Sequence, residues 1–164
     1  MRHFSTQKTL MTFVASLLTV CVAGSASAAT LTWDRDTTTA GIQTLNSGQT
    51  WDTTTARWTS DGGSSHQSWN NASNDDANFV LGTDCELSLG GSNLTANSIT
   101  YQNVNAAGTR RFTLTNGTLT LTSGLLSGTA GGQAEQFFLN SKLSGSNGIQ
   151  ASGTTGLVSL QLSN

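Results

Sequence analysis

The chain has 164 residues, and four small or polar types (27 Thr, 21 Ser, 18 Gly and 13 Asn) account for nearly half of them, whereas 10% are charged and none is proline. This composition excludes a charge-driven disordered protein, a coiled coil and a collagen. With a formal charge of -2 the chain has no basic stripe for phosphate backbones, so we expect no nucleic-acid partner. The length fits one domain behind a targeting peptide.

Residues 1–28 have the pattern of a secretory signal peptide. Arg2 and Lys8 form a basic start, residues 10–22 are apolar, and residues 26–28 (Ala-Ser-Ala) are a small-residue cleavage site. A membrane-spanning helix needs roughly 20 apolar residues, more than this segment offers. We therefore expect export with cleavage after residue 28, an extracellular or cell-surface location with outer membrane or periplasm as alternatives, and no membrane span in the mature chain.

The mature chain, residues 29–164, keeps five basic and nine acidic residues, a formal charge of -4. Because Cys21 is removed with the signal peptide, Cys85 is left alone and no disulfide can form within the chain. Cys85 begins a strand-like run that ends at Leu89, so we expect it to be a small buried hydrophobe; its role stays open.

Residues 29–80 contain all four tryptophans and a near-repeat. Trp33-Asp34 recurs as Trp51-Asp52, and the threonine triplet 37–39 recurs at a similar offset as 53–55. Such a repeat predicts two successive strand-turn units. We expect residues 29–80 to form a β cap rich in Trp and Asp.

Residues 81–164 consist of short strings in which apolar and polar residues alternate, the pattern of half-buried strands. The strings are Leu87–Leu89, Ile99–Tyr101, Phe112–Thr115, Leu119–Thr122 and Val158–Leu162. Turns are predicted at the breaks between them, Gly90-Gly91, Asn116-Gly117, Gly131-Gly132 and Asn147-Gly148, because Asn and Gly tolerate a positive φ. Only residues 133–139 offer a turn of helix, and a strand through 137–139 is an equal alternative.

These strings predict an all-β fold, a parallel β-helix (solenoid) whose rungs occupy residues 81–164. Strands of three to five residues with thin apolar faces suit stacked rungs, whereas a sandwich needs longer strands with bulky residues. A small β-sandwich is the alternative. The sequence ends inside an alternating strand without a polar cap, so we expect a truncated member of a longer class.

A series of short motifs recurs along the chain: Trp33-Asp34, the run 51–58 (Trp-Asp-Thr-Thr-Thr-Ala-Arg-Trp), Trp69-Asn70-Asn71 and the run 75–79 (Asp-Asp-Ala-Asn-Phe). This series resembles the N-terminal segment of bacterial autotransporter-associated β-strand repeat proteins, also called passenger-associated transport repeat proteins. The later run 116–121 (Asn-Gly-Thr-Leu-Thr-Leu) is similar to the family's strand motif, so the resemblance spans roughly residues 30–162. It implies a right-handed parallel β-helix at the cell surface or in the medium.

Residues that carry chemistry are few. His66 is the only histidine of the mature chain, and its Ser-rich surroundings predict a solvated loop residue. The pairs Asp34/Asp36 and Asp75/Asp76 could in principle serve glycoside hydrolysis, which needs two carboxyl groups on one bond. Adjacent strand residues point to opposite faces, which argues against the pair Asp75/Asp76. We therefore expect no enzyme and no cofactor.

Two binding alternatives remain. Residues Asn74, Asp75, Asp76 and Asn78 concentrate oxygen ligands suited to calcium, although Asx turns explain them without an ion. The second alternative is a secreted carbohydrate-binding β-domain, in which exposed tryptophans stack on sugar rings; its residues are Trp33, Trp51, Trp58 and Trp69. The favoured role for these tryptophans is to plug the N-terminal end of the solenoid.

The main expectation is thus an exported, non-enzymatic β-repeat passenger segment that acts as a surface stalk, adhesin or extracellular matrix component. Its partners would be host or matrix glycans or surface proteins.

Overall fold

The computed structural model of the protein describes residues 27–104, 110–129, 135–153 and 158–162, and every regular element in these ranges is a strand. The expected all-β class is therefore confirmed. The expected signal peptide lies, up to residue 26, outside the described residues, as does the predicted turn at 131–132.

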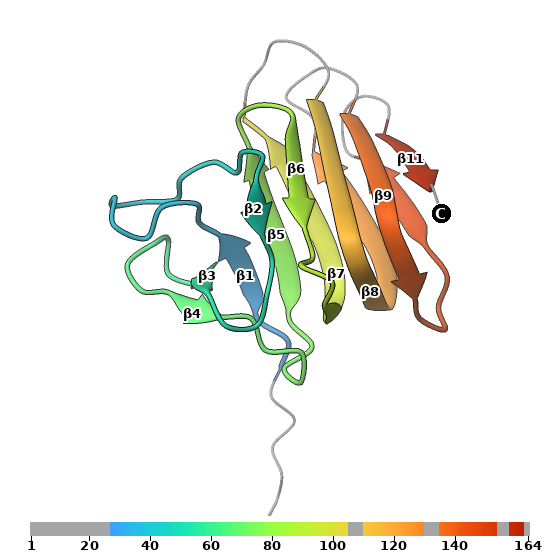
Figure 1. Ribbon diagram of the computed structural model, residues 1–164, viewed down its shortest axis with the longest axis horizontal. Coiled ribbons are helices and arrows are strands. Elements are labelled where there is room, and N and C mark those ends of the chain that lie inside the picture. Colours follow the sequence, from blue (N-terminus) through green and yellow to red (C-terminus); the bar gives the residue numbers. More distant parts are fainter. Residues whose placement is uncertain (1–26, 105–109, 130–134, 154–157, 163–164) are drawn as a thin grey trace, which may run out of the picture.

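The strands form one curled sheet of mixed direction (Figure 1). Their bounds are β1 Thr30–Trp33, β2 Gln49–Thr50, β3 Ala56–Thr59, β4 Gln67–Ser68, β5 Asp76–Leu81, β6 Cys85–Ser88, β7 Asn93–Asn103, β8 Arg110–Thr129, β9 Glu135–Ser144, β10 Gln150–Gly153 and β11 Val158–Leu162. Long strands replace several of the predicted short strings, because β7 and β8 run through corners where the register shifts, for example between Thr115 and Thr118 of β8.

Parallel pairing arranges these strands in three ladders. The first contains β1, β5, residues 98–103 of β7, residues 125–129 of β8, and β10. The second contains β2, β6, residues 110–115 of β8, residues 135–140 of β9, and β11. The third contains residues 93–96 of β7, 118–121 of β8 and 142–144 of β9.

From β5 onward the chain visits the first, second and third ladders in turn. Each residue pairs with one that lies a single circuit of chain further along, as Ala77 does with Ile99 and Cys85 with Phe112. Because the pairing is parallel and in register, residues of like burial are aligned across strands. For example, Leu87 pairs with Leu114, Leu114 pairs with Leu139, and all three are buried.

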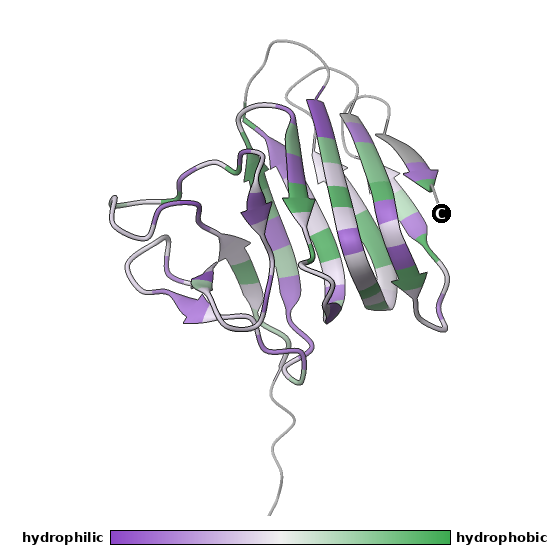
Figure 2. Cartoon of the chain, in the orientation of Figure 1, coloured by the Kyte–Doolittle hydropathy of each residue, from purple (hydrophilic) through white to green (hydrophobic). Residues whose placement is uncertain are grey.

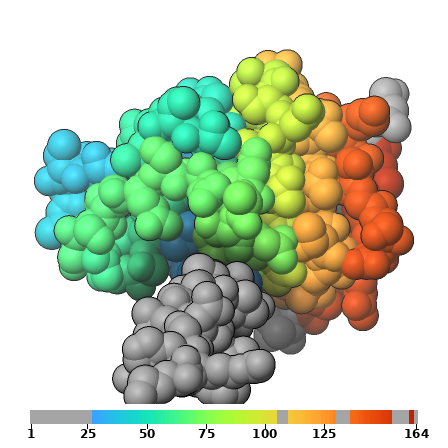
Figure 3. Space-filling view, turned by 90° about the horizontal axis from the view of Figure 1, so that it is seen from below, coloured from blue at the N-terminus to red at the C-terminus, as the bar shows by residue number. Residues whose placement is uncertain are grey.

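The N-terminal end of the sheet is different, because two short strands close it in antiparallel fashion. β3 pairs with β1, and β4 pairs with β3 on its far side. Figure 3 shows this N-terminal part on one side of the molecule and β8 and β9 on the other.

The alternation expected for half-buried strands is visible on β8 and β9, where green and purple bands follow one another (Figure 2). Phe112 and Leu114 are fully buried, whereas the threonine that follows each of them, Thr113 and Thr115, is partly exposed. The helical turn considered for residues 133–139 is wrong from residue 135 onward, because β9 begins there and its Phe137 aligns with Phe112 of β8.

The predicted turns at Gly90-Gly91 and Asn116-Gly117 are corners between ladders rather than hairpins. Asn116 has a φ of 57° and Gly91 a φ of 75°, and the two corners are bonded to each other, since Gly91 N donates to Asn116 O over 2.6 Å. Asn and Gly are favoured there because they adopt positive φ at little cost.

Candidate functional site

A polar groove follows the short strand β2 near the N-terminal end of the sheet. It consists of two adjoining hollows that share Gly48, Gln49 and Thr50. The first, of about 220 Å³, is also lined by Trp33, Asp52, Thr55 and Arg57. The second, of about 380 Å³, is also lined by Ser47 and by Glu86 and Ser88 of β6. The groove therefore brings together parts of the chain that are distant in sequence, because β2 pairs with β6.

Gln49 is held in the groove by the aromatic core. Its Oε1 accepts a hydrogen bond of 3.2 Å from Nε1 of Trp33, a residue that is 1% exposed. The contact leaves the amide nitrogen of Gln49 as a donor for a ligand.

Asp52 is held by a turn that its own carboxylate organises. The carboxylate accepts hydrogen bonds from the backbone and hydroxyl groups of Thr54 and Thr55, over 2.6 to 3.0 Å. Burial by itself would raise the pKa of Asp52, but these hydrogen bonds outweigh it, and the pKa lies below its ordinary value. Asp52 therefore presents a fixed negative charge to the groove.

Asp36 makes the same turn earlier in the chain, where its carboxylate accepts from Thr38 and Thr39. The structural repeat is thus Asp-Thr-Thr-Thr-Ala, at residues 36–40 and 52–56. The alignment predicted from the tryptophans, which equates Trp33-Asp34 with Trp51-Asp52, is out of step with this repeat, because it is Asp36 and not Asp34 that matches Asp52.

Arg57 supplies the positive charge of the groove. Within the described ranges the structure records no ion pair to its guanidinium, although its backbone oxygen accepts from Asp34 N over 2.8 Å. Arg57 therefore lines the first hollow without a paired carboxylate from the described part of the chain.

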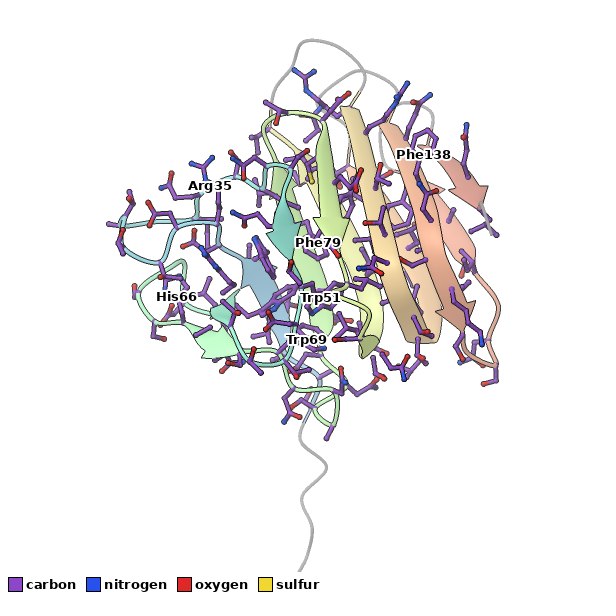
Figure 4. The ribbon with its side chains drawn as sticks, viewed as in Figure 1. Arg35, Trp51, His66, Trp69, Phe79 and Phe138 are labelled. Carbon is purple, nitrogen blue, oxygen red and sulfur yellow. The ribbon has the colours of Figure 1, made fainter. Side chains whose placement is uncertain are left out.

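The four tryptophans are brought together, but inside the molecule. Trp33, Trp51, Trp58 and Trp69 are between 0 and 2% exposed and pack against one another and, for three of them, against Phe79. Figure 4 shows Trp51, Trp69 and Phe79 close together. The expectation that they offer exposed platforms to sugar rings is therefore wrong, because no ring face is free at the surface. Among the described residues, the indole nitrogens of Trp51 and Trp58 have no hydrogen-bond partner. Their rings make edge-to-face contacts, Trp51 with Trp69 and Trp58 with Trp33.

The side chains considered for calcium have separate protein partners. Asp75 Oδ1 accepts from Ala29 N, and Asn74 Oδ1 accepts from the hydroxyl of Thr122. The same holds for the other two: Asp76 Oδ1 accepts from Asn97 and Ser98, and Asn78 donates to Thr32. These contacts join neighbouring strands and corners of the sheet. In the described part of the chain, no group of three or more His, Cys, Asp or Glu side chains is placed to hold a metal ion.

His66 is not the solvated loop residue that its neighbours predict. Its Nε2 lies 2.9 Å from Oδ2 of Asp34, and the two side chains are 11% and 0% exposed. Asp34 also accepts from the backbone nitrogens of Asp36 and Gln43. The pair ties the loop before β4 to the loop after β1, an arrangement that local sequence cannot reveal because the two residues belong to different loops.

Cys85 is buried, as expected. Burial raises the pKa of its thiol to about 12, and the nearby charges of Asp84 and Glu86 act in the same direction. The thiol is therefore protonated and unreactive at neutral pH.

No family model, curated protein or solved structure matches this chain. Within the described residues, no helix is long and apolar enough to cross a membrane. The fold and the site thus define the molecule as an all-β protein with parallel ladders and a polar groove near the N-terminal end of its sheet.

Proposed function

We propose that the chain is an exported, non-enzymatic β-repeat segment of an extracellular scaffold, such as a surface stalk, an adhesin passenger or a matrix component. In this proposal the three ladders are the faces of a parallel β-helix, and the family is that of the autotransporter-associated β-strand repeats. A signal peptide, removed after Ala28, directs the chain out of the cytoplasm.

The observation that carries the proposal is the regular return of the chain to each ladder, in parallel and in register, after one circuit of similar length each time. In such stacking the backbone N–H and C=O groups of one turn of chain form hydrogen bonds with the neighbouring turn. Each added turn lengthens the body along one axis. The outward positions are mostly Thr, Ser, Asn and Gln, which solvate the body without attracting charged molecules. These features suit a spacer that projects from a surface.

Export is tested by expressing the full chain with a C-terminal tag in a Gram-negative bacterium. The expected product begins at Ala29 and is recovered outside the cytoplasm, as determined by mass spectrometry and cell fractionation. A matched control, Leu17→Arg with Leu18→Arg, interrupts the apolar segment and should leave the precursor in the cytoplasm. A wild-type product that keeps residues 1–28 in the cytoplasm contradicts the proposal.

A further inference from the structure

The groove along β2 is a concave feature in which charged and polar side chains converge, and its ligand can be inferred from what lines it. Its two hollows, of about 220 and 380 Å³, share the lining residues Gly48, Gln49 and Thr50, and the second by itself has the volume of a small-molecule site. The tryptophans beneath hold its base rigid, because Trp33 is buried and bonded to Gln49.

The lining supplies both donors and acceptors. Arg57 contributes a planar fork of donors, Asp52 and Glu86 contribute carboxylate acceptors, and Gln49 contributes an amide donor. A sugar hydroxyl both donates and accepts, so adjacent hydroxyls on one ring can bond to a guanidinium and a carboxylate at the same time.

The charges of the groove select against acidic ligands. An anion would approach Arg57 but would be repelled by Asp52 and Glu86, which together outnumber the guanidinium. A neutral ligand is free of this penalty and still uses each charge as a strong hydrogen-bond partner.

We propose that this groove binds a neutral oligosaccharide, whose ring hydroxyls bond to Gln49, Asp52 and Arg57 in the first hollow and to Glu86 in the second. The inference deepens the proposed function, on which it rests, since an exported scaffold with such a groove attaches to polysaccharide. It also moves carbohydrate recognition from the tryptophan rings, which are buried, to the polar side chains above them.

The test is calorimetric titration of the purified chain, without residues 1–28, against soluble hexasaccharides of β-1,4-glucan, β-1,3-glucan, mannan and galactan, with hexagalacturonate as the acidic counterpart. At least one neutral hexasaccharide should bind and the acidic one should not. Arg57→Ala and Gln49→Ala should each weaken binding by about tenfold or more, because each removes a charged or preoriented partner. Arg57→Lys should bind more weakly than wild type, since it keeps the charge and loses the fork.

Arg111→Ala is the matched control, because Arg111 is an exposed arginine of β8 that does not line the groove and lies over the ring of Phe138. It should bind like wild type. Thermal unfolding of each variant shows whether a loss of binding comes from a loss of fold. Absence of binding across the neutral panel, binding confined to the acidic saccharide, or binding unchanged in folded Arg57→Ala and Gln49→Ala overturns the inference. None of these results bears on the export test, which reads the N-terminus and location of the product.

Discussion

Single aspartates organise the loops at the N-terminal end of this protein. Asp36 and Asp52 each gather the backbone and hydroxyl groups of the threonines that follow, and Asp61 does the same with Ser64 and Ser65. Such turns are stabilised best by the ionised carboxylate, which accepts but does not donate. Each loop therefore depends on the charge of one residue.

This dependence predicts a loss of stability in acid. Hydrogen bonds from the hydroxyl and backbone of Thr38 lower the pKa of Asp36 below its ordinary value of 3.8, and those from Ser65 and Thr59 lower the pKa of Asp61. A carboxylate whose pKa is lower in the folded state stabilises the fold above its unfolded pKa, and this contribution is lost as the pH falls toward the native value. The free energy of unfolding, measured with urea, should therefore decrease from about pH 5 to about pH 2.

The matched variant for this prediction combines Asp36→Asn, Asp52→Asn and Asp61→Asn. It should be less stable than wild type at neutral pH and should depend less on pH across the acid range, because it has no charge to lose at these positions. An equally steep pH dependence in the variant would assign the acid sensitivity to other carboxylates.

At the scale of elements, the corners decide how closely successive turns of chain can approach. Gly117 lies where a Cβ would come within 2.6 Å of the Leu89 Cβ and 2.7 Å of the Ser92 carbonyl oxygen. Asn116, just before it, takes the positive φ that lets β8 change ladder. The Asn-Gly pair thus serves two needs at one corner, a backbone conformation and a close approach.

Replacing Gly117 with alanine should destabilise the protein by about 1–3 kcal/mol, because the methyl group meets backbone and Cβ atoms that cannot move without shifting the neighbouring corner. Chemical denaturation measures the change. Gly91→Asn is the control, since the Cβ would meet open space and Asn tolerates the φ of 75° found there. Equal destabilisation by the two substitutions would contradict the role of the close contact at Gly117.

The strand positions of the repetitive half were largely predictable, because alternation of apolar and polar residues identifies a half-buried strand wherever it occurs. The runs at Phe112–Thr115 and Leu119–Thr122 lie within β8 as expected. Their partners could not be read from the alternation, since every such run has the same period. Register instead follows from the corners, where Asn116 and Gly124 take positive φ and the shifts occur.

At the scale of the whole molecule, one apolar core runs from the tryptophans to β9. Ring contacts lead from the tryptophans through Phe79 to Phe112 and on to Phe137. The N-terminal part and the repetitive part therefore share a core, although their compositions differ. We expect residues 29–164 to unfold as one cooperative unit.

Trp51 lies at the centre of this core, with its ring centroid 5.1, 5.0 and 5.5 Å from those of Trp58, Trp69 and Phe79. Trp51→Ala should reduce the free energy of unfolding by about 3–5 kcal/mol, because it leaves a cavity among rings that cannot close on it. Urea denaturation followed by circular dichroism measures the change. Val104→Ala, at a residue that is 53% exposed, should change stability by less than about 0.5 kcal/mol. A small loss for Trp51→Ala would show that the rings are not part of the cooperative core.

Only part of the groove could be predicted from the sequence. Asp52 and Thr55 stand within a motif that the sequence displays, so a turn at this place was foreseeable. Gln49 and Glu86 belong to no motif, and only the pairing of β2 with β6 brings Glu86 near the rest of the groove. The same holds for His66, whose partner Asp34 comes from another loop.

The sequence by itself determined the all-β class, most strand positions of the repetitive half and the burial of Cys85, because each follows from local alternation and side-chain polarity. Only the tertiary structure decided that the tryptophans face inward, that three parallel ladders form, and that distant polar residues share a groove. The physical reason is that local periodicity orients a side chain relative to its own strand, whereas contacts between strands depend on where the chain returns.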